Sequence, residues 1–278
     1  MSRRIRLGIS PCPNDTFAFH GLLTRAVDWR GLDFEVSLLD IERLNEALLA
    51  REFDVCKASF RAAIEVADDV VILPSGSALG FGVGPLLLAA TSGSVPADGR
   101  QLTLCPGRLT TAALLFELFH PGTTRVEHVV FSEIMPRLSA GIADFGVCIH
   151  EGRFTWQRHG LGLVEDLGAR WEEESRCPLP LGGLVADRNL PRETIATVQA
   201  VVRDSLQFAL ATPAAALPTM RAHAQEFDDD VLMRHVDLYV NEWTEDLGET
   251  GARALDEFSA RARAVGIGSA AALRVFDG

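Results

Sequence analysis

The sequence predicts an α/β protein of two units, in which a smaller unit is inserted into a larger one. Short apolar strands alternate with amphipathic helices through the first half of the chain, which is the pattern of sheets covered by helices. Residues 91–100 have the composition of a linker, and Gly182-Gly183 indicate the return of the chain. We therefore assign residues 1–90 with 181–278 to a larger discontinuous α/β domain, and residues 91–180 to a smaller inserted one.

Charge and composition exclude several classes of partner. The net charge of −12, from 26 basic and 38 acidic residues, argues against binding to nucleic acid or to an anionic membrane. Arg3, Arg4 and Arg6 are not followed by the apolar stretch of a secretory signal, so we expect a cytoplasmic protein. An odd number of cysteines without Cys-x-x-Cys spacing argues against a disulfide framework and a zinc site. The five are Cys12, Cys56, Cys105, Cys148 and Cys177.

The stretch that follows the first predicted strand carries polar groups suited to a ligand. Residues 5–9 alternate as in a strand, and apolar residues recur at helical spacing from Phe17 onward. Asn14, Asp15 and Thr16 lie at the junction, where any of their side chains can cap the helix. The backbone N–H groups at such a junction favour a polar ligand. The alternative is an ordinary strand-to-helix loop.

The remaining elements follow from apolar periodicity. We predict a helix at 41–49 with Asp40 as its cap, and a strand at 55–60 with Lys57 and Ser59 on one face. Lys57 is the only lysine among 26 basic residues and Tyr239 is the only tyrosine, so both are candidates for a specific role. Further strands are predicted at 32–38, 70–73, 86–90, 126–130 and 145–149, and helices at 112–119, 133–140, 195–210, 214–224, 231–241 and 252–265.

Two more places in the predicted smaller unit carry chemistry. At 106–111 a glycine turn leads to threonine hydroxyls at a helix start, which suits a carboxylate ligand, although plain capping by threonine explains the pattern equally well. His150 follows the strand at 145–149, where an imidazole can accept a proton near neutral pH; the alternative is a structural histidine. Glu151 and Arg153 fall on the opposite face if the chain stays extended, and either can serve structure instead.

Several strings along the chain together resemble one enzyme family. They are Ser-Pro-Cys-Pro-Asn-Asp-Thr-Phe from Ser10, Lys57-Ala58-Ser59, Ser-Gly-Ser-Ala-Leu-Gly from Ser75, Pro-Gly-Arg-Leu-Thr-Thr-Ala from Pro106 and Ile-His-Glu-Gly-Arg-Phe-Thr from Ile149. In this order they resemble the 1,4-dihydroxy-6-naphthoate synthases of the futalosine route to menaquinone. The likeness extends to Tyr239-Val240-Asn241 and therefore covers nearly the whole chain.

The resemblance implies a fold, a reaction and a site. The fold is that of type II periplasmic binding proteins, with a ligand cleft between the domains. The reaction opens cyclic dehypoxanthine futalosine to 1,4-dihydroxy-6-naphthoate without a metal or organic cofactor, and His150 is the implied general base. A small-molecule carboxylate is the expected partner, and the oligomeric state is left open. The substrate-binding residues that it implies are Asn45, Lys57, Ala58, Ser59, Thr111, Ala112 and Ile149. We expect Asn14, Asp15, Thr110 and Arg153 to bind substrate beside them.

Two other classes remain as alternatives. A solute-binding protein shares the fold, but such proteins normally work outside the cytoplasm. Chorismate dehydratase belongs to the same pathway and has a similar fold, but we expect it to lack the string that begins at Ser10. If His150 is not the base, Asp15 is the next candidate.

Overall fold

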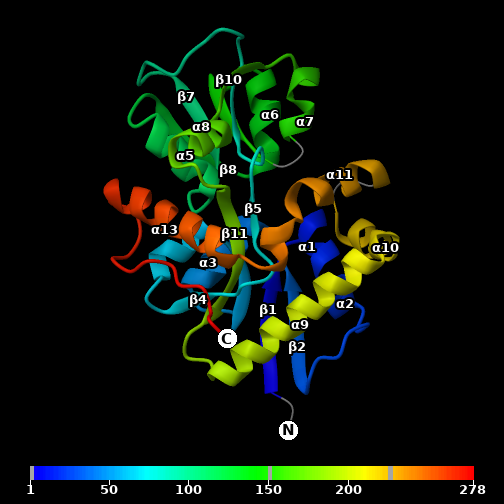
Figure 1. The fold of residues 1–278 in the computed structure, drawn as a ribbon. Coiled ribbons are helices and arrows are strands. Elements are labelled where there is room, and N and C mark those ends of the chain that lie inside the picture. Colours follow the sequence, from blue (N-terminus) through cyan, green and yellow to red (C-terminus); the bar gives the residue numbers. More distant parts are fainter. Residues whose placement is uncertain (1–2, 150–151, 225–227) are drawn as a thin grey trace. The chain divides into compact units, whose positions relative to one another are not determined.

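The structure is a computed structural model that describes residues 3–149, 152–224 and 228–278 (Figure 1). The chain forms two compact units, Met1–Gly80 with Pro180–Gly278, and Phe81–Leu179. Each unit contains its own mixed sheet and its own helices, which confirms the predicted α/β class. The first division lies before Phe81 rather than after Ala90, because β6 (Leu86–Ala89) pairs with strands of the second unit. The expected ligand cleft stays a prediction.

The sheet of the first unit is parallel on one side and antiparallel on the other. β1 pairs in parallel with β2 and β3, whereas β11 runs antiparallel to β3 and β4. The carboxyl ends of β1, β2 and β3 therefore meet at one edge of the sheet. The order is β2-β1-β3-β11-β4, with β5 on β11, and the strands are β1 (Arg3–Ile9), β2 (Leu32–Leu38), β3 (Val55–Ser59), β4 (Val70–Ile72), β5 (Ala78–Gly80) and β11 (Leu179–Asp187).

The helices of the first unit follow the predicted pattern. Asp40 caps α3 as expected, since its side chain accepts hydrogen bonds from the backbone N–H groups of Glu42 and Arg43. The helices are α1 (Pro13–Ala18), α2 (His20–Leu23), α3 (Ile41–Leu49), α4 (Phe60–Ala63), α9 (Arg192–Ala211), α10 (Pro213–His223), α11 (Asp229–Tyr239), α12 (Glu242–Glu245) and α13 (Gly248–Ala264).

The apolar core of the first unit lies on both faces of β1. Ile5, Leu7 and Ile9 point to one face, where they pack with apolar residues of α9, the helix that crosses β1 and β2 in Figure 1. Gly8 points to the other face. A Cβ atom there would lie 2.8 Å from the side chain of Leu44 on α3, so glycine permits the close approach of this helix.

A separate apolar cluster brings α11 onto α1. Phe17 of α1 packs with Met220 of α10 and with Leu232 and Val236 of α11. All four residues are buried. This packing places the polar side chains of α11 beside the start of α1, although the two helices are far apart in the sequence.

The second unit is built around a five-stranded sheet of order β10-β6-β9-β7-β8. β7 is parallel to β8 and β9, and β6 is antiparallel to β9 and β10. β6 is buried along its whole length, as its apolar sequence predicts. The other strands are β7 (Leu102–Pro106), β8 (Arg125–Val129), β9 (Phe145–Cys148) and β10 (Gly162–Asp166), and the helices are α5 (Thr111–Phe119), α6 (Phe131–Ser139), α7 (Gly152–Thr155) and α8 (Leu167–Ser175).

The sequence does not predict α7, β10 and α8 of the second unit. The alternation of β10 is interrupted, because its pairing register shifts between Leu163 and Glu165. α8 contains only nine residues and is rich in glutamate. A signal for α8 is nevertheless present: Asp166 caps it through the backbone N–H of Ala169, and the buried Trp171 lies one turn further on.

Candidate functional site

The polar residues of the first unit gather at the carboxyl ends of β1 and β3. Gly8 pairs in parallel with Cys56, so Ser10, just after β1, lies at the same edge as Lys57 and Ser59 of β3. In open α/β sheets this edge is where ligands bind, because loops and helix starts meet there. Ser10, Lys57 and Ser59 are all buried.

Asp15 is the centre of this cluster. Its Oδ1 accepts hydrogen bonds from Lys57 Nζ at 2.7 Å and from Asn14 Nδ2 at 3.0 Å, and its Oδ2 accepts one from Ser10 Oγ at 2.6 Å. The side chain is therefore not a helix cap. The predicted capping by Asn14, Asp15 or Thr16 is wrong, since α1 begins after Cys12 without any side-chain cap. The carboxylate instead accepts from the side chains of Lys57, Asn14 and Ser10.

Lys57 is almost fully buried and makes two polar contacts. Besides the ion pair with Asp15, its Nζ donates to the backbone carbonyl oxygen of Gly76 at 2.8 Å. These are the two acceptors found for the ammonium among the residues that the structure describes. Because an ammonium has three N–H donors, one remains for a ligand.

Asn45 and Ser59 form a second polar pair beside Lys57. Asn45 on α3 donates from Nδ2 to Ser59 Oγ at 3.1 Å, and its Oδ1 accepts from the backbone N–H of Ser59 at 2.8 Å. Asn45 is fully buried, so both bonds form away from water. Ala58, between the two predicted site residues of β3, is also buried and pairs with Gly183 of β11. The amide of Asn45 thus fixes the end of β3.

One buried hydroxyl in this region lacks a partner. Ser77 is fully buried, and within the described part of the chain its Oγ has no hydrogen-bond partner. It faces Gly183, where a Cβ atom would lie only 2.7 Å from this oxygen. Ser77 directly follows Gly76, whose carbonyl contacts Lys57. An unpaired buried hydroxyl is unusual, and it makes Ser77 a further candidate site residue.

In the second unit, the predicted residues of α5 and Ile149 lie at the sheet edge formed by the carboxyl ends of β7 and β9. β7 and β9 are parallel, with Leu104 paired to Gly146, so the start of α5 and Ile149 follow strand ends at one edge. Thr110 caps α5: its Oγ1 accepts from the backbone N–H of Ala113 at 3.2 Å. Thr111 and Ala112 are buried in the first turn, and Ile149 is half-buried. His150 lies outside the described residues.

Arg153 on α7 makes contacts within the second unit. Its Nη1 donates to the carbonyl oxygen of Gly84 at 2.5 Å, and its Nη2 pairs with Asp166 Oδ2 at 2.8 Å. Asp166 is also the cap of α8. The guanidinium therefore joins three segments of this unit, which is the structural role that the sequence left open for it.

The five cysteines form no disulfide bond in the described structure, and all except Cys12 are buried. Burial raises the pKa of Cys56, Cys105 and Cys148 to about 12, so these thiols are protonated at neutral pH. Within the described ranges, no group of three or more His, Cys, Asp or Glu side chains is arranged to hold a metal ion. Among the same residues, no helix is both long and apolar enough to cross a membrane.

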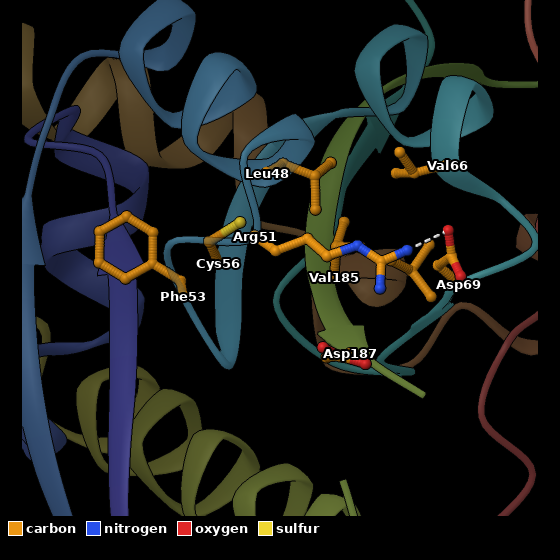
Figure 2. A pocket seen from close by; sticks show the side chains of 9 residues that line it. Leu48, Arg51, Phe53, Cys56, Val66, Asp69, Val185 and Asp187 are labelled. Atoms are coloured by element: carbon orange, nitrogen blue, oxygen red, sulfur yellow. Dashed lines mark ion pairs between the residues drawn. The ribbon is translucent and has the colours of Figure 1, made fainter. Parts of the chain in front are cut away.

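A small pocket in the first unit lies apart from the polar cluster. It is lined by residues that include Leu48, Cys56 and Val185, and Arg51 pairs with Asp69 within it (Figure 2). Its water-accessible volume is about 20 Å³, enough for about one water molecule. Because side chains alternate along β3, Cys56 points to the face opposite Lys57. We therefore do not assign a substrate to this pocket.

Sequence reasoning missed two members of the polar cluster. Ser77 lies in a string used only for the family resemblance, and its burial could not be foreseen from glycine-rich surroundings. His235 on α11 contacts Asn14 although 221 residues separate them, with Nε2 at 3.1 Å from Asn14 Oδ1. No local pattern reveals a pair that only the packing of α11 on α1 creates.

Comparisons with solved structures define the class of protein. The chain matches a crystal structure of a protein from Archaeoglobus fulgidus with a TM-score of 0.88 and 31% identity, covering 95% of this chain and 98% of that one. It also matches the aliphatic sulphonate binding protein SsuA of Escherichia coli, with a TM-score of 0.63 and 11% identity, covering 95% and 88%. The fold is thus the two-domain, type II fold of periplasmic binding proteins.

Sequence comparisons define the family. The family model for menaquinone biosynthesis matches residues 5–264. The chain is 44% identical over 263 residues to 1,4-dihydroxy-6-naphthoate synthase of Thermus thermophilus, covering 95% of each protein. It is 39% identical over 269 residues to the synthase of the same name from Streptomyces coelicolor, covering 95% and 94%. The chain belongs to the menaquinone biosynthesis family, and the resemblance to the 1,4-dihydroxy-6-naphthoate synthases is confirmed.

Proposed function

We propose that this protein is a carbon–carbon lyase of menaquinone biosynthesis that converts cyclic dehypoxanthine futalosine to 1,4-dihydroxy-6-naphthoate. Two relatives of this name that cover nearly the whole chain support the assignment. The structural observation that carries it is the buried Lys57 ammonium, which keeps one N–H donor for a ligand after its contacts with Asp15 and Gly76. A single buried cation suits one carboxylate or one carbonyl oxygen of the substrate.

In this proposal, the polar cluster of the first unit binds the substrate. Lys57 donates to a substrate oxygen, and the hydroxyl of Ser59 is oriented for the same task by Asn45. Ala58, Asn14 and Asp15 complete this part of the site. In the second unit, the proposed substrate residues are the helix start Thr110, Thr111 and Ala112, together with Ile149 and Arg153.

His150 is the proposed general base. An imidazole is available as a base at neutral pH, and its removal of a substrate proton would start the cleavage of the carbon–carbon bond. Aromatisation of the product would favour the overall reaction, and a three-carbon fragment would leave. The assignment rests on the position of His150 in the string that begins at Ile149.

The test is to incubate the protein separately with cyclic dehypoxanthine futalosine and with chorismate, and to identify the products by mass spectrometry. Formation of 1,4-dihydroxy-6-naphthoate supports the proposal. Dehydration of chorismate, or binding of either compound without turnover, contradicts it and identifies a dehydratase or a binding protein. His150→Asn should bind substrate but react at least ~100-fold more slowly, because a positioned base contributes about 10²–10⁴ to the rate.

A further inference from the structure

A chain of hydrogen bonds connects α11 to the Lys57 ammonium. His235 Nε2 lies 3.1 Å from Asn14 Oδ1, and Asn14 Nδ2 donates to Asp15 Oδ1 at 3.0 Å. The same carboxylate oxygen accepts from Lys57 Nζ at 2.7 Å. His235, Asp15 and Lys57 are all more than nine-tenths buried, so these bonds form largely out of contact with water.

The side-chain amide of Asn14 has a donor, Nδ2, and an acceptor, Oδ1. The series of hydrogen bonds from His235 to Lys57 requires one orientation of this amide. With Nδ2 toward the carboxylate, Oδ1 faces the imidazole, and Nε2 of His235 must be the donor. A rotated amide would place its oxygen against the Asp15 carboxylate and its NH₂ group against an N–H donor. Both contacts would be repulsive. The carboxylate of Asp15, which can only accept, therefore fixes the orientation of the Asn14 amide, and His235 holds the amide in that orientation by donating from Nε2 to Oδ1.

The position of Asp15 in turn decides where Lys57 can point. The ammonium is held between Asp15 Oδ1 and the carbonyl oxygen of Gly76, and these two contacts fix the direction of its third N–H. If Asn14 released the carboxylate, Asp15 would keep only Ser10 and Lys57 as its donors among the described residues. The carboxylate would gain freedom, and the ammonium would move with it.

We propose that His235 is a positioning residue of the substrate site, which orients Lys57 through Asn14 and Asp15. The ring of Tyr239, one turn further along α11, packs on the imidazole with a centroid distance of 4.6 Å and supports its rotamer. The only tyrosine of the chain thus supports the residue that orients its only lysine. The assignment of a substrate to Lys57 rests on the proposed function, whereas the contacts themselves do not.

The chain offers a matched control in His20. It is also buried, with 7% of its surface exposed, as for His235. It likewise makes a side-chain hydrogen bond, between Nδ1 and Thr219 Oγ1 at 2.8 Å, and stacks on the ring of Phe208. The difference is that Thr219, the partner of His20, has no hydrogen bond to Asp15 or Lys57 in the described structure. Loss of packing alone should affect variants of both histidines alike.

The first measurement is steady-state kinetics with cyclic dehypoxanthine futalosine. His235→Phe keeps an aromatic ring but removes the donor, so its KM should rise about three- to tenfold while kcat changes less than about twofold. His235→Gln can place an amide N–H near the former Nε2, and it should restore KM to within about twofold of wild type. His20→Phe should leave KM unchanged. Should His235→Phe not fold, His235→Asn, whose amide is shorter, replaces it.

The second measurement does not depend on turnover. Because Lys57 is the only lysine, protein labelled with ¹³C,¹⁵N-lysine gives one side-chain Cε–Nζ signal in NMR spectra. This signal should shift or broaden in His235→Phe, return in His235→Gln and stay at its wild-type position in His20→Phe. Asn14→Ala should shift it as well, and adding His235→Phe to Asn14→Ala should change it no further, because the connection is already broken.

The two measurements separate the inference from the proposed function. If wild-type protein does not convert the substrate but the Lys57 signal responds as expected, the positioning role stands and the proposed function fails. If wild-type protein is active and His235→Phe leaves both KM and the Lys57 signal unchanged, the positioning role is wrong. It is also wrong if His20→Phe produces the same changes as His235→Phe, since the effect would then be one of packing.

Discussion

The ammonium of Lys57 lies 2.7 Å from Asp15 Oδ1, and the two side chains are exposed by only 6% and 3% of their surfaces. Removing two charges from water is costly, and their attraction offsets that cost only while both are present. Lys57 therefore has a structural role in addition to any contact with a ligand.

We expect Lys57→Met to destabilise the protein as well as to weaken binding. The methionine would leave the Asp15 carboxylate buried without its cation, which typically costs about 3–5 kcal/mol of unfolding free energy. Ser10 and Asn14 would still donate to the carboxylate and reduce this loss. Unfolding in urea, followed by circular dichroism, measures the difference from wild type.

The double variant Asp15→Asn with Lys57→Met is the matched control. It removes both charges while nearly keeping the volume of both side chains, so it should be more stable than Lys57→Met alone. Wild-type stability of Lys57→Met would show that the pair contributes nothing. Lys57→Arg keeps the charge, but its planar guanidinium does not fit a space shaped by two single acceptors, and full activity would argue against a specific role for the ammonium.

Ser77→Ala should cost little stability or even increase it. The hydroxyl is buried without a partner within the described structure, so its removal loses no hydrogen bond. Ser205→Ala is the control, because Ser205 is equally buried but donates to Ala18 O and accepts from Leu22 N; its loss should cost about 1–3 kcal/mol. If Ser77→Ala is destabilised as much as Ser205→Ala, the Ser77 hydroxyl is hydrogen-bonded in the folded protein and the prediction is wrong.

Local features of this protein were predictable from sequence, whereas the partners of its polar residues were not. The strand before Ser10, the Asp40 cap and the common face of Lys57 and Ser59 each follow from residues a few positions apart. The ion-pair partner of Asp15 does not follow from nearby residues. It is Lys57, which lies 42 positions away and is brought close only by the parallel pairing of β1 and β3. Capping was therefore the best local prediction for Asp15, and it was wrong.

The residues of the candidate site differ in the same way. The family resemblance selected Asn45, Lys57 and Ser59, which the structure places in one buried cluster. The resemblance did not indicate His235, because the contact of His235 with Asn14 depends on the apolar packing of α11 against Phe17. The role of His150 likewise stays a prediction, to be tested through catalysis.

Gly84→Ala should strongly destabilise the second unit. A Cβ atom at this position would lie 2.2 Å from the Cα atom of Gly168, and backbone atoms cannot give way as a flexible side chain can. The carbonyl oxygen of Gly84 also accepts from Arg153, so a shift of this segment would disturb that contact. We expect a loss of at least ~1–3 kcal/mol in urea unfolding.

Gly99→Ala serves as the control for this substitution. No heavy atom lies within 4 Å of a Cβ built at Gly99, and its backbone does not require glycine. The exposed alanine should leave stability within about 0.5 kcal/mol of wild type. Equal stability of the Gly84→Ala and Gly99→Ala variants would mean that the close contact of Gly84 with Gly168 relaxes without cost.

His20 should make stability depend on pH as the pH falls below about 6.5. Burial lowers its pKa below the value of about 6.5 expected in the unfolded chain. Between these two pKa values the unfolded state binds more protons than the folded state, so stability rises with pH. The contribution is fully present above pH 6.5 and is lost as pH falls through the range below it.

His20→Gln cannot titrate, so the stability of wild type minus that of His20→Gln should decrease as pH falls. Urea unfolding of both proteins at several pH values measures this difference, from which other titrating groups such as the exposed His128 cancel because both proteins contain them. A difference that stays constant, or that grows toward pH 5, would show that the folded protein accommodates the imidazolium of His20 without cost.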